Sequence, residues 1–184
     1  MRKALLLILV LLFCSQPVMA ARYQRTEAVY TPPDVTLLDQ QRNKVRLPEF
    51  LQTDQPVLVD FIYATCTTIC PVMSAGFANL QKKFAKSGQK ARFVSVTIDP
   101  EHDSPEVLAD YAARYRARPG WTFLTGSRDD IVAVMKAFDA FVPDKMEHYP
   151  LIFIRKPDGG WVRIYGLVGT RDLMKEFRRY YPEG

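Results

Sequence analysis

Hydrophobic and polar positions alternate along the chain in a way that marks strands and helices. Residues 57–63 are apolar except for Asp60 and rich in β-branched and aromatic side chains, which is typical of a strand covered on both faces. A stripe with helical spacing follows and predicts a helix that starts at Pro71 and ends near Gly88. The members of the stripe are Met73, Phe77, Leu80 and Phe84. A strand followed directly by a helix indicates the first half of a β-α-β unit.

The same strand-helix rhythm repeats through the middle of the chain. Residues 92–98 predict a strand, and Ser104 and Pro105 then supply an N-cap and a first helical residue. A short strand at residues 121–124 precedes Ser127, which opens another helix with a capping-box-like start. Both helices carry an apolar face that is expected to pack on a sheet. The residues on these two faces are Val107, Leu108, Tyr111, Tyr115, Ile131, Val134, Met135 and Phe138.

Hairpins are predicted on both sides of this central region. Residues 35–38 and 44–47 flank a polar turn, which predicts an N-terminal hairpin at an edge of the sheet. Residues 151–155 and 162–165 flank a Lys-Pro-Asp-Gly-Gly turn, and a last helix follows with Thr170 as its cap. The order of segments predicts an α/β fold, with a central mixed β-sheet flanked by helices.

The N-terminus has the layout of a secretory signal peptide over residues 1–20. Two basic residues precede an apolar run at residues 4–13, and small residues end the segment at Ala20. The run is about half as long as a bilayer span, so cleavage is expected and an uncleaved membrane anchor is the alternative. Residues 21–33 then form a polar leader, and residues 34–184 form one domain. The protein is expected in the periplasm or facing it from the membrane.

Charge and cysteine content narrow the range of functions. The net charge is +5, and it falls to +3 once residues 1–20 are removed with their two basic side chains. Such a mild excess argues against a nucleic-acid partner. Of the three cysteines, only Cys66 and Cys70 follow the signal peptide. An oxidising compartment lets such a pair form a disulfide unless a reductant or a metal ion intervenes.

Cys66 and Cys70 are the sharpest chemical feature, because they lie where a buried strand meets a helix. Open α/β sheets place their ligand-binding and catalytic residues at the carboxyl ends of the strands. The N-terminus of a helix also stabilises a thiolate. In a helical loop, residues four apart share a face, so both sulfurs could bind one ion. Soft thiolates favour copper(I), zinc or iron-sulfur chemistry. The alternative is a small structural disulfide, which closes a short loop and therefore stabilises little.

The two histidines of the chain are the other candidate ligands. His148 directly precedes the strand at residues 151–155. One imidazole with two thiolates makes a three-ligand site that copper occupies in either oxidation state, whereas zinc normally has four ligands. His102 also follows a central strand and is flanked by Asp99 and Asp103, which are themselves candidate ligands. These carboxylates could instead simply hold a solvated imidazole.

Together these residues resemble the Sco/SenC family of copper-binding assembly factors for cytochrome c oxidase. The resemblance covers nearly all of residues 32–181. It rests on residues 59–63 (VDFIY), 66–71 (CTTICP), 95–105 (SVTIDPEHDSP) and His148.

The resemblance implies a thioredoxin-like fold in which Cys66, Cys70 and His148 bind one copper ion, Cu(I) or Cu(II). It also implies a chaperone that delivers copper to a respiratory protein, such as the copper A centre of an oxidase subunit. An upstream copper donor or a thiol reductant would be a further partner. The family often has Asp where this chain has Glu147 and Arg where it has His102, so the recipient stays open.

Two other functions stay open beside the copper chaperone. In a thiol-disulfide oxidoreductase, Cys66 would attack a partner disulfide and Cys70 would resolve it, which keeps partner cysteines reduced for metallation. In a peroxidase-like protein or a peroxide sensor, a low-pKa cysteine at a helix start would be oxidised to a sulfenic acid. The basic end of the last helix is a candidate contact for an acidic partner or the membrane surface. Its residues are Lys175, Arg178 and Arg179.

Overall fold

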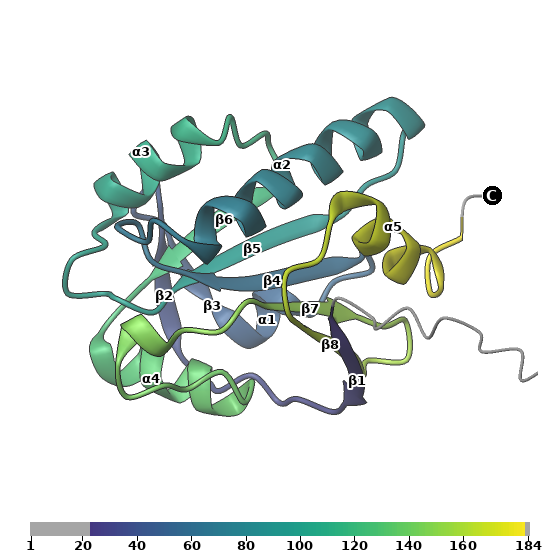
Figure 1. Cartoon of the computed structure of the whole chain (residues 1–184). Helices are drawn as coiled ribbons and strands as arrows, with labels where there is room; N and C mark the ends of the chain where they lie inside the picture. The colour runs from purple at the N-terminus through teal and green to yellow at the C-terminus, as the bar shows by residue number, and fades with distance from the viewer. Residues whose placement is uncertain (1–22, 183–184) are drawn as a thin grey trace, which may run out of the picture.

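The computed structural model describes residues 23–182, which form an eight-stranded mixed sheet with helices on both faces (Figure 1). The strands are β1 (Gln24–Ala28), β2 (Thr36–Asp39), β3 (Lys44–Arg46), β4 (Val57–Ile62), β5 (Arg92–Thr97), β6 (Trp121–Thr125), β7 (Leu151–Arg155) and β8 (Trp161–Tyr165). The helices are α1 (Leu47–Leu51), α2 (Ile69–Ser87), α3 (Pro105–Arg114), α4 (Arg128–Ala137), the 3-10 helix η1 (Lys145–Glu147) and α5 (Thr170–Arg178). The predicted central mixed sheet is confirmed.

Strand order in the sheet is β1-β8-β7-β4-β5-β6-β2-β3. The central strands β4, β5 and β6 are parallel, and all other pairs are antiparallel. Every residue of β4 is buried, as its nearly continuous apolar sequence predicts for a parallel strand covered on both faces. The hairpin of β2 and β3 lies at one edge, which confirms that prediction.

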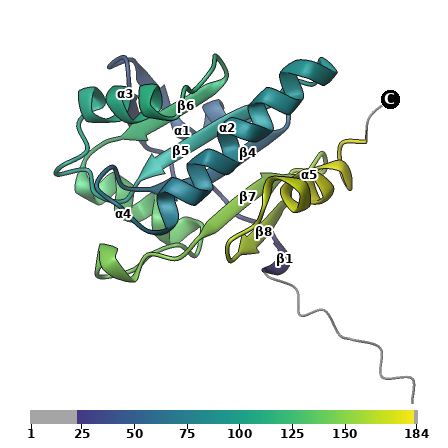
Figure 2. The ribbon, with the colours of Figure 1, turned by 45° about the horizontal axis from the view of Figure 1, so that its top comes forward.

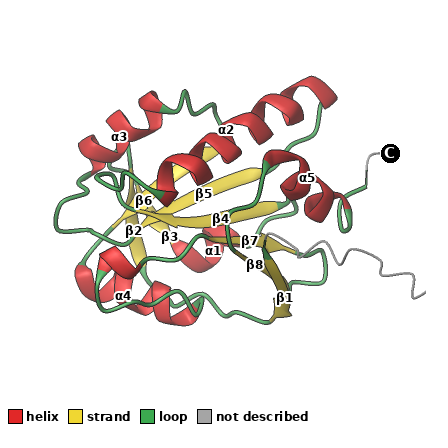
Figure 3. Cartoon of the chain, viewed as in Figure 1, coloured by secondary structure: helices red, strands yellow, loops and turns green. Residues whose placement is uncertain are grey.

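Helices α2, α3 and α5 cover one face of the sheet, and α1 and α4 cover the other (Figure 3). Figure 2 shows α2 lying along β4 and β5. The predicted apolar stripe of α2 is buried, and its Phe77 ring meets Trp121 of β6 at 5.7 Å between centroids. On the opposite face, Phe138 at the end of α4 meets Phe153 of β7 at 5.3 Å. Each face of the sheet therefore has its own apolar core.

The prediction that residues 21–33 form a polar leader before the fold is wrong for residues 24–28, which form strand β1. Residues 24–28 pair antiparallel with β8, and Tyr23 and Arg25 bond to the carboxylate of Glu176 on α5. The strand is polar and lies at the sheet edge, so its sequence carries no hydrophobic alternation. The predicted signal peptide at residues 1–20 lies outside the described residues. Among the helices of residues 23–182, none combines the length and apolar character that crossing a membrane requires.

Three local expectations also differ from the structure. Helix α1 was not expected, and it is a single short turn that buries Leu47 and Leu51. Gly169 is the N-cap of α5, and Thr170 is its first helical residue. Val107 was expected to face inward but remains 37% exposed, because the sheet is reached by its neighbours Leu108 and Tyr111.

Candidate metal and dithiol site

The two cysteines meet at the N-terminus of α2. Cys66 lies in the loop after β4, where its backbone N–H donates to the carbonyl of Tyr63 at 3.1 Å. Cys70 is the second residue of α2, and its N–H donates to the Sγ of Cys66 at 3.5 Å. Both are free thiols, and Cys66 is only 6% exposed. The structure therefore brings the two predicted sulfur ligands together at the carboxyl end of a central strand.

The surroundings of the two thiols push their pKa values in opposite directions. Burial opposes ionisation of Cys66, but hydrogen bonds from the Cys70 amide and thiol and from Thr68 outweigh it and lower its pKa to about 7. Burial raises the pKa of Cys70 well above its usual value, and the neighbouring Cys66 raises it further. Near neutral pH the pair therefore consists of one partly ionised sulfur and one protonated sulfur.

A buried carboxyl group lies behind the dithiol. Asp60 on β4 is fully buried; one oxygen accepts a hydrogen bond from Ser95 at 2.6 Å, and the other oxygen has no hydrogen-bond partner in the described part of the chain. Burial raises the pKa of Asp60 to about 7, and its charge in turn raises the pKa of Cys70. The sequence had shown Asp60 only as an exception in an apolar strand. An acidic residue inside an otherwise apolar strand was the signal that could have identified Asp60 as a candidate functional residue.

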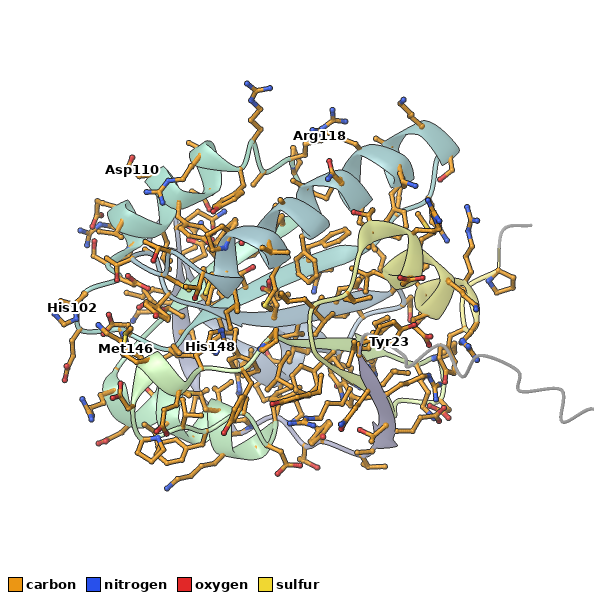
Figure 4. All side chains as sticks on the ribbon, in the orientation of Figure 1. Tyr23, His102, Asp110, Arg118, Met146 and His148 are labelled. Carbon is orange, nitrogen blue, oxygen red and sulfur yellow. The ribbon has the colours of Figure 1, made fainter. Side chains whose placement is uncertain are left out.

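His148 follows η1 in the loop before β7. Burial lowers the pKa of its imidazole to about 4, so the ring is neutral at neutral pH. Its Nε2 atom is buried and has no hydrogen-bond partner among the described residues. His148 lies near the middle of the view in Figure 4, beside Met146. A neutral ring with an unpartnered nitrogen has the form that a metal ligand requires.

Tyr63 lies against both the cysteine loop and the histidine loop. Its ring meets that of His148 edge to face, with 6.1 Å between centroids. Its hydroxyl donates to the Sδ of Met146 at 3.7 Å, and burial together with a hydrogen bond to Cys66 raises its pKa to about 12. Within residues 23–182, no three Cys, His, Asp or Glu side chains are already arranged to hold a metal ion. The loops that carry the three predicted ligands are therefore neighbours, but the three side chains do not yet have the arrangement of a metal site.

Asp103 fixes the loop that leads to Cys66. Its buried carboxylate accepts hydrogen bonds from the Ala64 N–H at 3.0 Å and from the Thr97 hydroxyl at 2.5 Å. Burial raises its pKa despite these hydrogen bonds. Asp103 thus links the ends of β4 and β5 through hydrogen bonds, and it is a buried structural residue rather than an accessible ligand.

Asp99 and His102 form a separate cluster with Lys145. The carboxylate of Asp99 accepts from Lys145 at 2.5 Å and lies 2.9 Å from His102 Nδ1. Burial opposes ionisation of Asp99, but these two partners outweigh it and lower its pKa. Because Lys145 begins η1, this ion pair ties the loop of His148 to the end of β5. The His102 side chain is 65% exposed and projects from the edge of the molecule (Figure 4).

A dithiol at the start of a helix that follows a central strand, in a mixed sheet covered on both faces, defines a thioredoxin-like protein. Residues 24–180 match the SCO1/SenC family model. The chain belongs to the SCO1/SenC family, and the resemblance predicted from the sequence is confirmed.

Three relatives illustrate the match. The SCO1 protein homolog of Bacillus subtilis (strain 168) is 37% identical over 116 residues, which cover 59% of this chain and 60% of that protein. BsSco, a member of the Sco family of cytochrome c oxidase assembly proteins, is 30% identical, with a TM-score of 0.71 over 84% of this chain and 95% of that chain. Copper-bound ScoI of Bradyrhizobium japonicum has a TM-score of 0.65 at 23% identity, over 83% and 99% of the two chains.

Proposed function

We propose that this protein binds one copper ion through the thiolates of Cys66 and Cys70 and the imidazole of His148. It then delivers the ion to a respiratory copper site, such as the copper A centre of an oxidase subunit. The observation that carries the proposal is a dithiol in which Cys66 has a lowered pKa, next to a loop that holds a neutral imidazole whose Nε2 has no hydrogen-bond partner among the described residues. Copper binds these deprotonated forms. The copper held by ScoI of Bradyrhizobium japonicum and the family assignment of BsSco support it.

In the proposed sequence of events, copper first binds the Cys66 sulfur, which is the more easily ionised of the two thiols. The positive charge of the ion then lowers the pKa of Cys70, which loses its proton and becomes the second ligand. The Tyr63 ring and the His148 loop shift relative to one another, and Nε2 of His148 becomes the third ligand. Copper leaves by ligand exchange with the cysteines of the recipient.

Copper titration of the reduced chain from Ala21 to Gly184 tests this proposal. We expect one bound copper and thiolate-to-copper(II) absorption bands, and we expect His148→Ala to abolish the bands or weaken binding at least tenfold. His102→Ala is the matched control, because His102 is an exposed histidine on a neighbouring loop. An unchanged titration in His148→Ala, or an equal loss in both variants, would show that His148 is not a ligand.

The opposite pKa shifts of the two free thiols favour a second candidate, a thiol-disulfide oxidoreductase. The Cys66 thiolate would attack a partner disulfide, form a mixed disulfide and release one partner thiolate. Cys70 would then lose its proton and attack the Cys66 sulfur, which forms the Cys66–Cys70 disulfide and releases the second partner thiol. A disulfide switch has been identified in BsSco, which is consistent with this chemistry.

Reduction of a disulfide-bonded peptide by the metal-free protein tests the second candidate. We expect Cys70→Ser to accumulate a mixed disulfide at Cys66, and His148→Ala to keep most of the activity. If the metal-free dithiol does not reduce the peptide, the oxidoreductase is excluded while the copper chaperone stands. The two candidates are compatible, because one dithiol can perform both reactions.

We further propose that the protein is exported to the periplasm and that its signal peptide is cleaved after Ala20. The layout of residues 1–20 supports this. The intact mass of the protein purified from the periplasm tests it, because cleavage leaves Ala21 as the first residue. A retained N-terminus in the membrane fraction would favour the anchor instead.

A further inference from the structure

A groove between α2 and α5 gathers positive charge on one side of the molecule. It has a volume of about 580 Å³. Its lining consists of Lys83, Lys86 and Ser87 from α2 and Arg171, Met174, Lys175 and Arg178 from α5. Five of these seven residues are cationic, and no carboxylate belongs to the lining among the described residues. The side chains of Lys83, Lys86, Arg171 and Lys175 are exposed, so a ligand at this surface can reach them.

Helix α5 carries two acidic residues, Asp172 and Glu176, and neither of them lines the groove. Glu176 is 2% exposed and bonds to Tyr23 at 2.8 Å and to Arg25 at 2.9 Å. Arg171 and Lys175 are four residues apart and therefore share one face of the helix. The groove thus presents a positive surface, because neither carboxylate of α5 belongs to its lining.

The chain enters the fold next to α5, one of the two helices that line the groove. Tyr23 is the first described residue (Figure 4), and its hydroxyl donates a hydrogen bond to Glu176 on α5 at 2.8 Å. In the sequence, the apolar run of the signal segment ends at Phe13, ten residues before Tyr23. Ten residues reach at most about 35 Å when fully extended. In the proposed export, with the apolar run in the membrane, Tyr23 and the end of α5 that it contacts lie within roughly that distance of the membrane.

The dithiol lies at the other end of α2. Cys70 is in the first turn of the helix and Lys86 in the last, so about 24 Å of helix separates them at 1.5 Å per residue. A membrane bound through Lys86 therefore does not cover the end of α2 where Cys66 and Cys70 lie.

We propose that the groove between α2 and α5 is a docking site for the headgroups of anionic phospholipids. It holds the protein at the membrane surface after the signal peptide is removed. The contact is electrostatic, since clustered lysine and arginine side chains are attracted to anionic lipid surfaces and the attraction is screened by salt. This proposal does not depend on copper binding or on disulfide exchange.

Vesicle co-sedimentation of the chain from Ala21 to Gly184 tests this proposal. This form contains every described element and lacks the apolar run, so the run cannot contribute to binding. The probes are vesicles of phosphatidylcholine alone and vesicles of phosphatidylcholine mixed with the anionic lipid phosphatidylglycerol. We expect binding only to the anionic vesicles, and loss of binding as salt is raised. The variant Lys83→Gln/Lys175→Gln removes one cation from each helix, and we expect its affinity to fall roughly 25-fold.

The matched control is Lys44→Gln/Lys136→Gln, which removes the same charge from β3 and α4. We expect it to bind anionic vesicles within about twofold of wild type. An equal loss of vesicle affinity in both variants would show that binding depends only on net charge, and this result would overturn the proposal. Equal binding to neutral vesicles would also overturn it. If a polyglutamate peptide binds through Lys83 and Lys175 while vesicles do not, the groove is a protein-docking surface instead.

Discussion

The backbone N–H of Cys70 donates to the Sγ of Cys66 at 3.5 Å, across the first turn of α2. This contact gives the two thiols different chemistry although their positions in the motif are similar. Cys66 receives hydrogen bonds at the open end of a helix, and Cys70 lies fully buried beside Asp60. Several expectations follow from this asymmetry and from the contacts that support it.

Alkylation of Cys66 by iodoacetamide is expected to speed up as the pH rises, with a midpoint near pH 7. The thiolate is the nucleophile, and the pKa of Cys66 is lowered to about 7. Cys70 is expected to react at least roughly 100-fold more slowly at neutral pH, because its pKa is raised and its side chain is buried. Peptide mapping of the reduced wild-type protein measures both rates. A Cys66 midpoint above about 8.5, the ordinary thiol pKa, would contradict the site described here.

Replacing Asp60 with Asn is expected to stabilise the protein at alkaline pH. The folded-state pKa of Asp60 is about 7, above the value of an unfolded carboxyl, so the folded state binds more protons between about pH 4 and pH 7. The free energy of unfolding therefore falls as the pH rises through this window. Asp60→Asn removes the cost of the buried charge, and it should add roughly 1–3 kcal/mol at pH 8 but little at pH 4.

Urea denaturation at the two pH values measures the effect of Asp60→Asn. Asp110→Asn serves as the control, because Asp110 is exposed on α3 (Figure 4). An equal gain at pH 4 and pH 8 would show that the ionisation of Asp60 is not the cause.

Replacing Asp103 with Ala is expected to lower the free energy of unfolding by ~2–3 kcal/mol, because two buried hydrogen bonds are lost and their donors stay unpaired. The donors are the Ala64 N–H and the Thr97 hydroxyl. Faster hydrogen exchange at the amide of Ala64 is expected in the same variant. Glu101→Ala is the control, since Glu101 pairs with Arg128 at the exposed surface and should leave both measurements unchanged.

Replacing Glu176 with Ala is expected to destabilise the protein by ~2–3 kcal/mol, because Tyr23 and Arg25 lose a buried carboxylate partner. The exposed pair of Arg42 and Glu106 gives the control, and Glu106→Ala should have no measurable effect. Thermal and urea unfolding measure both variants. A similar small effect in both would mean that β1 is held by strand pairing alone.

Most of the secondary structure was predictable because its apolar spacing is regular. The stripe that starts at Met73 defines α2, and the continuous apolar run of β4 defines a central parallel strand. Strand β1 and helix α1 were missed because both are short and one is almost entirely polar. The bonds of Tyr23 and Arg25 to Glu176, about 150 positions away, are long-range contacts that leave no local pattern.

The candidate site likewise combines features that the sequence predicts with features that it does not predict. The positions of Cys66 and Cys70 at a strand-helix junction follow from the sequence. The roles of Tyr63, Asp60 and Asp103 do not, because each depends on which loops meet at one edge of the sheet. Asp103 was a candidate ligand in the sequence, and its place among buried donors made it a structural anchor.

By itself, the sequence determined the order of most elements, the position of Cys66 and Cys70 at a strand-helix junction, and the family, because these depend on spacing and residue type along the chain. Tertiary structure decided the chemistry of the ionisable groups. The pKa values of Cys66, Asp60 and His148 are set by burial and by partners from other segments. It also decided that the basic side chains of α2 and α5 form one surface, since only packing of the two helices brings them together.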